Sequence, residues 1–202
     1  MKALFSAAYF PPIAWLAAAL RYDTLYIEAV ETYPKQTYRN RMEIMTAGGV
    51  RTLTVPVVRS NHSRTEEVAI DWRNRWSTIH MRTITAAYSA SPYYLYYKDG
   101  IEQLLGQKYD TLLDLDISTI KWLLAQYKIN TKIEVTTEWS SPKSDPHDYR
   151  YIFTPKRPFH TESFKPYYQV FSDRLPFVPN LSALDLLMNL GPEAKEYIKN
   201  IG

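Results

Sequence analysis

The sequence predicts an α+β fold (mixed α/β), and three observations lead to this class. Pro11-Pro12 divide an N-terminal apolar run into a strand-length and a helix-length piece, Gly48-Gly49 separate two strand-like runs, and helical patterns fill the middle. We expect an N-terminal βαβ-like unit and a β-hairpin to form one mixed sheet, packed by the helical middle section and by C-terminal helices. The 202 residues fit a single domain, 1–202.

The N-terminal run predicts a strand, a turn and a helix in succession. Residues 3–9 have the pattern of a buried strand, and Pro12 suits the first helical position because its missing N–H is not needed there. A second strand is expected at 25–29. A secretory signal peptide over residues 1–20 is the alternative. The proline pair counts against it, since the apolar core of a signal is a continuous helix.

The elements that follow are predicted from hydrophobic periodicity and from glycine, proline and capping residues at their ends. Residues 42–46 and 52–57 are strand candidates around Gly48-Gly49, whose positive φ angles suit a tight hairpin. Residues 68–70 and 132–138 are further strand candidates. Three helices are expected, at 74–90, at 91–106 where Ser91-Pro92 open the helix and Gly106 ends it, and from a cap at Asp116 or Ser118 to Asn130.

The stretch 142–179 differs from the rest because it holds seven of the thirteen prolines. We expect it to be irregular, with a short strand near 168–171, and it is either a lid or a wrapped connection. Ser182 and Asp185 then open a helix as a variant of the capping box. Gly191-Pro192 close that helix, and a short last helix is expected at about 193–200.

Composition removes several classes of protein. The chain has no Cys, which excludes disulfides, thiolate metal sites and cysteine nucleophiles. The net charge of +3 is mixed along the chain and does not favour nucleic acid as a partner. Outside the N-terminal run no apolar stretch approaches the ~20 residues of a membrane span. We therefore expect a cytoplasmic protein without a transmembrane segment.

No metal and no cofactor is expected. The four histidines, at positions 62, 80, 147 and 160, lack the HxH and HExxH spacings of metal sites. The chain has neither a Walker loop nor a G-x-G-x-x-G motif, and no G-x-S-x-G elbow supports a serine nucleophile.

The strongest functional candidate is the basic, aromatic run 33–41, which holds Lys35, Arg39 and Arg41 and no acid. Arginine offers a planar fork to phosphate or carboxylate, and lysine offers a point charge. The alternative is a solvated basic loop paired with Glu28 and Glu31. Both interpretations remain open from composition alone.

Two further candidates carry polar chemistry. His80 lies in register with Trp76, Ile84 and Tyr88, so it is either a satisfied core histidine or a general base in a cleft. Ser140 and Ser141 follow a strand end, where ligand hydroxyl contacts are common, although a turn before Pro142 explains them equally well.

Several motifs follow one another along the chain: Tyr9-Phe10-Pro11-Pro12, the run 35–41, Leu53-Thr54-Val55-Pro56-Val57, Trp76 with His80, Ile84 and Tyr88, Ser91-Pro92-Tyr93, Ser140-Ser141, and 177–182 with Asp185-Leu186-Leu187. Taken in this order, they resemble the WbqC-like protein family. The chain differs at Ala8, where many relatives have Gln, and at Glu28 or Glu31, where relatives tend to have Asp.

The resemblance implies a part in bacterial surface-polysaccharide (O-antigen) synthesis, with an aminoacyl or acyl transfer to an amino sugar. The partners would be a nucleotide- or lipid-linked sugar and an activated acyl or aminoacyl donor. Under this hypothesis Lys35, Arg39 and Arg41 hold a phosphate, Tyr9 and Tyr38 pack against the sugar, Asn40 hydrogen-bonds it, and His80 deprotonates the acceptor. The alternative is a non-catalytic sugar-phosphate-binding or scaffolding protein of the same pathway.

Overall fold

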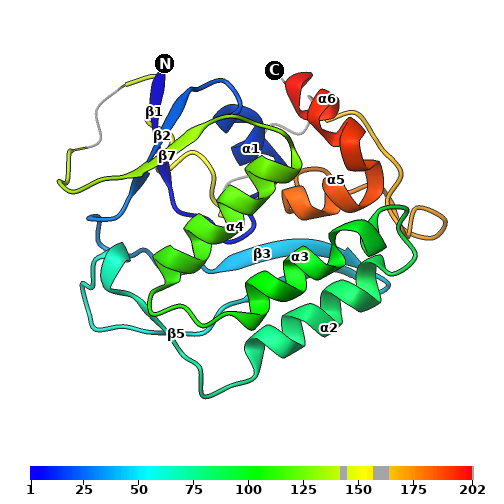
Figure 1. Cartoon of the computed structure of the whole chain (residues 1–202), viewed down its shortest axis with the longest axis horizontal. Coiled ribbons are helices and arrows are strands. Elements are labelled where there is room, and N and C mark those ends of the chain that lie inside the picture. Colours follow the sequence, from blue (N-terminus) through cyan, green and yellow to red (C-terminus); the bar gives the residue numbers. More distant parts are fainter. Residues whose placement is uncertain (142–144, 157–163, 202) are drawn as a thin grey trace.

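The computed structural model describes residues 1–141, 145–156 and 164–201 (Figure 1). The chain opens with β1 (Lys2–Ser6), α1 (Ile13–Ala19) and β2 (Thr24–Glu28), and the two strands are parallel. The distant strand β7 (Lys132–Val135) pairs in parallel with the other edge of β2, which gives the order β1-β2-β7. The expected βαβ-like unit is confirmed, and the α+β class with it.

The outer edge of β1 is also covered. The Leu4 N–H donates to the His147 carbonyl at 2.9 Å, and the Leu4 carbonyl accepts the Tyr149 N–H at 2.7 Å. The residues that pair with Leu4 belong to the proline-rich stretch 142–179, so the described part of that stretch extends the sheet beyond β1.

Helix α1 is buried on every side, which explains why its sequence is apolar throughout. Pro12 precedes the helix as its extended cap residue (φ −66°, ψ 158°) and is not the first helical residue. The free N–H groups at the helix start find distant acceptors: Ile13 donates to the Leu181 carbonyl at 2.9 Å and Ala14 to Asn180 Oδ1 at 2.8 Å. These two hydrogen bonds join the start of α1 to the residues just before the C-terminal helices.

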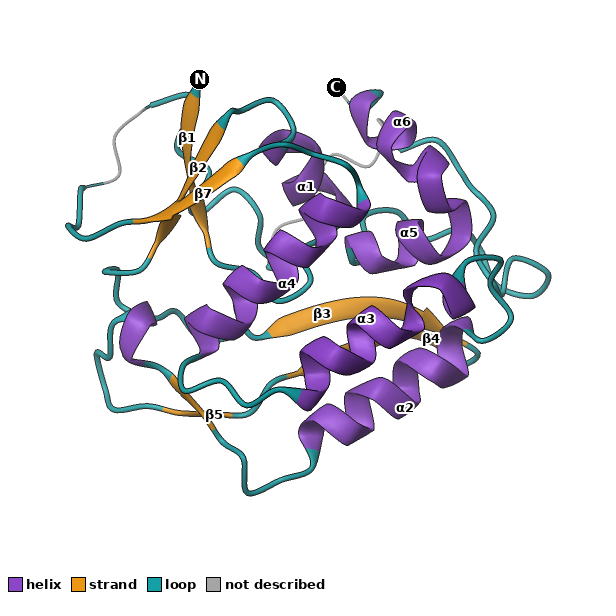
Figure 2. Ribbon diagram, in the orientation of Figure 1, coloured by secondary structure: helices purple, strands orange, loops and turns teal. Residues whose placement is uncertain are grey.

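The hairpin consists of β3 (Arg41–Thr46) and β4 (Gly49–Thr54), and Gly49 supplies the positive φ of its turn (+96°). It forms a sheet of its own, apart from the parallel sheet, as Figure 2 shows. The expectation of one mixed sheet is wrong in this detail, because the edge of β1 is taken by the residues around Tyr149. A third small ladder joins β5 (Val57–Val58) to β6 (Ala69–Ile70), with the short helix η1 (Thr65–Glu67) between them.

Three helices follow, as expected: α2 (Trp76–Tyr88), α3 (Tyr94–Gly106) and α4 (Leu112–Gln126). The predicted start of α4 is wrong. Its cap is Thr111, whose Oγ1 accepts the Asp114 N–H at 3.2 Å. Asp116 and Ser118 therefore lie inside the helix, and Asp116 is completely buried.

The chain ends in α5 (Ala183–Leu190), η3 (Gly191–Glu193) and α6 (Ala194–Lys199). Ser182 caps α5 as predicted, since its Oγ accepts the Leu184 N–H at 3.2 Å. The capping box is wrong in its other half, because the Asp185 carboxylate accepts the Tyr88 and Tyr167 hydroxyls and the Ser182 N–H donates to the Glu43 carbonyl. The strand expected at 168–171 is wrong: Gln169 and Ser172 close a turn through reciprocal hydrogen bonds of 2.8 Å. Parts of the stretch 142–179, with Pro142 and Pro158, lie outside the described residues.

Buried apolar side chains from Ala3 to Ile201 form one connected cluster between the parallel sheet, the hairpin and the helices. Within the described ranges, none of the helices combines the length and the apolar character needed to cross a membrane.

Candidate functional site

The candidate site lies beyond the carboxyl ends of the parallel strands, where ligands bind in open α/β sheets. Tyr9 follows β1, Glu28 ends β2 and Glu31 comes three residues later, while Thr136 follows β7. The segment between β2 and β3 brings the run 33–41 to the same edge, because the Tyr9 N–H donates to the Tyr38 carbonyl at 2.9 Å.

Arg39 is a buried cation and not a solvated one. Its Nε donates to Glu31 Oε1 at 2.9 Å, a second guanidinium nitrogen contacts the same oxygen, and both side chains are 3% exposed. Burial raises the pKa of Glu31, and the Arg39 guanidinium partly offsets that rise. The alternative interpretation of the run 33–41 is a solvated basic loop paired with Glu28 and Glu31. The pairing of Arg39 with Glu31 agrees with that interpretation, whereas the burial of Arg39 does not.

A second buried ion pair flanks the first. Arg150 Nη1 donates to Glu28 Oε2 at 2.8 Å and to the Ser140 carbonyl at 2.9 Å. The other oxygen of Glu28 accepts hydrogen bonds from the Val30 N–H and the Thr136 hydroxyl, each at 2.9 Å. Glu28 is therefore fully satisfied, and its charge contributes to the raised pKa of Glu31.

Asp116 is the exception among these carboxylates. It is completely buried, and within the described part of the chain neither of its oxygens has a hydrogen-bond partner. Burial raises its pKa well above the usual range, while Arg39 acts in the opposite direction. The protonated, neutral form of the carboxyl is thus favoured.

Asp116 lies within electrostatic range of several site residues. After burial, its charge is the largest cause of the raised pKa of both Tyr9 and Tyr33. Other buried polar atoms nearby also lack partners among the described residues, and an unsatisfied buried group costs about 1–3 kcal/mol. We call the following set the orphan cluster: both Asp116 oxygens, the Tyr33 hydroxyl, Asn40 Oδ1, Arg41 Nε and Thr65 Oγ1.

His80 reaches the site through Tyr9. The Tyr9 hydroxyl lies 3.0 Å from His80 Nδ1, and both side chains are buried. Burial lowers the pKa of His80 to about 4, against an opposing effect of the Thr54 carbonyl. The imidazole is therefore neutral at physiological pH, and its role as a base stays a prediction.

The remaining predicted residues divide into two groups. Asn40 and Arg41 lie at the start of β3, where Asn40 Nδ2 donates to the Val55 carbonyl at 3.0 Å, while the Tyr38 hydroxyl points to Glu43 at 3.4 Å. Lys35, Ser140 and Ser141 are exposed. The contact of Ser140 with Arg150 is made by its backbone carbonyl.

Sequence reasoning missed Asp116 and Arg150. Asp116 is four residues before Ile120 and therefore shares the apolar face of α4, so an acid at an inward position was the available signal. Arg150 carried no comparable signal, because its partners lie 122 residues away in the sequence at Glu28 and only two away at Asp148.

Within the described ranges, no group of three or more His, Asp or Glu side chains is arranged to hold a metal ion. The orphan cluster instead offers hydrogen-bond donors (Tyr33, Arg41), a neutral carboxyl and amide and hydroxyl acceptors. Such a set can orient a polar substrate and stabilise charge that develops on it.

Comparison with known proteins agrees with this arrangement of motifs. The chain is 25% identical to uncharacterized protein Rv1507c of Mycobacterium tuberculosis (strain ATCC 25618 / H37Rv), in an alignment covering 95% of this chain and 91% of that protein. No solved structure matches the chain significantly. The sequence profile of the WbqC-like protein family matches residues 7–154, which is well over half of the chain and includes Tyr9, the run 33–41, His80 and Asp116. The chain therefore belongs to the WbqC-like protein family.

Proposed function

We propose that the protein transfers an acyl or aminoacyl group to the amine of an amino-sugar intermediate in bacterial surface-polysaccharide (O-antigen) synthesis, and that the orphan cluster is where the reaction takes place. The orphan cluster is also the observation that carries the proposal. Buried polar groups without partners are rare in folded proteins and call for an explanation. A bound substrate that supplies the missing hydrogen bonds is one such explanation.

The chemistry assigns roles to Arg41, Tyr33, Tyr9 and His80. The amine nitrogen attacks the acyl carbonyl carbon, the new amide bond forms, and the leaving group of the donor departs with its electron pair. Arg41 and Tyr33 donate hydrogen bonds to the oxyanion of the tetrahedral intermediate. The proton lost by the amine passes to the Tyr9 hydroxyl as Tyr9 gives its own proton to His80 Nδ1.

The weak basicity of His80 is compatible with this role. The nitrogen of the tetrahedral intermediate is positively charged and gives up its proton far more readily than the free amine. A neutral imidazole with a pKa of about 4 is fully available as an acceptor at pH 7 and releases the proton quickly afterwards.

The test is a transfer assay with UDP-linked amino sugars as acceptors and acyl-CoA or glycyl donors, read by mass spectrometry of the sugar product. We expect the wild-type protein to form an amide product, and we expect His80→Gln to slow the reaction by about 100-fold or more. Asp116→Asn changes a polar group of the orphan cluster and should also slow the reaction. Asp173→Asn, which changes an exposed carboxylate, is the matched control and should keep full activity. Full activity of His80→Gln would remove His80 from the mechanism.

A non-catalytic sugar-phosphate-binding protein is the second candidate, favoured by the fact that His80 Nδ1 is already engaged by Tyr9. Native mass spectrometry of the freshly purified protein, followed by calorimetry with any metabolite found, separates the two. Tight binding without turnover under every donor and acceptor pair would support binding alone.

A further inference from the structure

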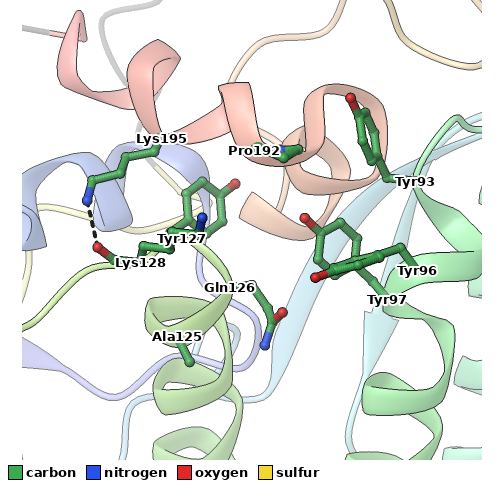
Figure 3. Close-up of a pocket in the computed structure, with 9 residues that line it drawn as sticks. All are labelled: Tyr93, Tyr96, Tyr97, Ala125, Gln126, Tyr127, Lys128, Pro192 and Lys195. Carbon is green, nitrogen blue, oxygen red and sulfur yellow. Dashed lines mark hydrogen bonds between the residues drawn. The ribbon is translucent and has the colours of Figure 1, made fainter.

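A pocket lies at the opposite end of α4 from the orphan cluster. The start of α3, the last turn of α4 and the η3–α6 segment enclose a cavity of about 300 Å³ (Figure 3). Asp116 and Tyr127 are separated by eleven residues, or about 16 Å along the helix axis. We call this cavity the tyrosine pocket, lined by Tyr93, Tyr96, Tyr97, Gln126, Tyr127, Lys128 and Lys195 among others.

Aromatic rings form one side of the tyrosine pocket. Tyr96 and Tyr97 lie edge to face with ring centroids 4.8 Å apart, and their hydroxyls point toward Gln126 and Tyr127 in Figure 3. The Tyr96 side chain is 77% exposed, which is unusual for a large aromatic residue. A flat apolar face with a hydroxyl at its rim suits the alternating C–H and O–H surfaces of a sugar ring.

The opposite walls are held rigidly. The Tyr127 hydroxyl donates to the Ala183 carbonyl at 2.7 Å, which fixes its ring against α5. Tyr93 packs so closely on Gly191 that a Cβ at that position would lie 2.4 Å from the ring, and Gly191 also has a positive φ of 54°. The pocket is thus largely preformed, as ligand sites usually are.

The charge of the pocket is positive. Its lining contains two lysines and no acid, and the Lys195 ammonium donates to the Lys128 carbonyl at 2.6 Å. Within the described ranges, neither ammonium forms an ion pair. An ammonium group has three donors, so Lys195 can still bind an anion.

We propose that the tyrosine pocket binds a sugar ring that carries a negative charge, as a carboxylate or as a phosphate. The ring stacks on Tyr96, its hydroxyls bond Gln126, and its anionic group meets Lys195. The volume of about 300 Å³ admits a small cyclic ligand and lies at the low end of ordinary ligand pockets. This inference stands apart from the transferase proposal, since the two places are different.

The test uses saturation-transfer NMR on the full chain with four probes: glucuronic acid, glucose 1-phosphate, glucose and UMP. Glucuronic acid and glucose 1-phosphate show whether the anionic group is a carboxylate or a phosphate. Glucose tests whether the charge is needed, and UMP tests whether the hexose ring is needed. Tyr96→Ala and Lys195→Gln are the pocket variants. Leu95→Ala, 81% exposed on the same helix as Tyr96, and Lys199→Gln, an exposed cation on the same helix as Lys195, are the matched controls.

We expect at least one anionic sugar to bind, and glucose to bind at least tenfold more weakly. Tyr96→Ala and Lys195→Gln should each weaken binding about tenfold, the loss typical of a stacking or a charged hydrogen-bond contact, while both controls stay within about twofold. Melting curves of all four variants verify that they fold. No saturation of any sugar, binding of UMP alone, or equal losses in the controls would each overturn the proposal.

Discussion

Asp116 and Asp185 are both completely buried carboxylates, yet their surroundings are opposite. Asp185 accepts hydrogen bonds from the Tyr88 hydroxyl at 2.8 Å, from the Tyr167 hydroxyl and from Gln169 Nε2 at 3.2 Å. Asp116 has no partner within the described part of the chain. Asp185 therefore fixes the folded state, whereas Asp116 is retained at a cost in stability, which is typical of residues that serve function.

This contrast gives a prediction about stability. The pKa of Asp116 is raised in the folded protein, so above pH ~4 the unfolded chain ionises first and the contribution of Asp116 to stability falls as pH rises. Asp116→Asn removes that loss, and we expect its advantage in the free energy of unfolding to grow between pH 4 and pH 7. Asp185→Asn should lose about 1–3 kcal/mol at pH 7. Urea unfolding at several pH values measures both, and a parallel pH dependence of Asp116→Asn and wild type would contradict the assignment.

His80 gives a prediction of the opposite sign. Burial lowers its pKa from 6.5 to about 4, so between these values the unfolded chain takes up a proton that the folded protein does not. The contribution of His80 to the free energy of unfolding should therefore rise with pH across this window, by up to about 3 kcal/mol, and it opposes the contribution of Asp116. The difference in the free energy of unfolding between wild type and His80→Gln should change with pH by this amount, while His62→Gln, at an exposed position, should follow the wild type. A difference between wild type and His80→Gln that is the same at pH 4 and pH 6.5 would contradict the assignment.

At the scale of elements, both ends of α5 were predicted well, because Ser182 and Gly191-Pro192 mark them. The predicted cap at Ser91 is wrong: α3 begins at Tyr94 after Tyr93, and the Ser91 hydroxyl has no partner within the described part of the chain. The start of α4 was misplaced because three acids and hydroxyls, Thr111, Asp114 and Asp116, all resemble caps in the sequence. Asp116 turns inward in the fold, in line with its place four residues before the buried Ile120.

Ser182 and Thr111 allow the caps themselves to be tested. Ser182 accepts the Leu184 N–H and also donates to the buried Phe10 carbonyl at 2.8 Å. Thr111 is half-buried, and its Oγ1 bonds only with Asp114 of its own helix. Ser182→Ala should therefore cost about 2 kcal/mol or more and Thr111→Ala about 1 kcal/mol or less. Equal losses in chemical denaturation would show that the Phe10 contact contributes nothing.

At the scale of the whole molecule, the sheet order was beyond sequence reasoning. Alternation identified β7, but nothing local indicates that it pairs with β2 or that residues near Tyr149 pair with β1. The same holds for the orphan cluster, whose members come from η1, α4, β3 and the segment before β3. Composition identified the run 33–41, and only the fold could show that Arg39 is buried against Glu31.

Substitution of Arg150 measures how much its ion pairs, which join the proline-rich stretch to the parallel sheet, contribute to stability. It joins Glu28 of β2 to Asp148, and its side chain is 1% exposed. Arg150→Met leaves both carboxylates without their cation and should cost about 3–5 kcal/mol in the free energy of unfolding. Adding Glu28→Gln should recover part of that loss, while the exposed Arg174→Met should have little effect. Additive losses in the double variant would contradict the direct pairing.

The pairing of β1 with both β2 and the residues near Tyr149 has a consequence for synthesis on the ribosome. The first β-α-β segment emerges early, but its sheet stays open on both sides until residues 132–149 have been made. The N–H groups at the start of α1 cannot form their hydrogen bonds until Asn180 and Leu181, close to the end of the chain, have been made. Such long sequence separations slow folding and expose unpaired strand edges meanwhile. We therefore expect nascent chains shorter than about 180 residues to need a chaperone that covers these edges.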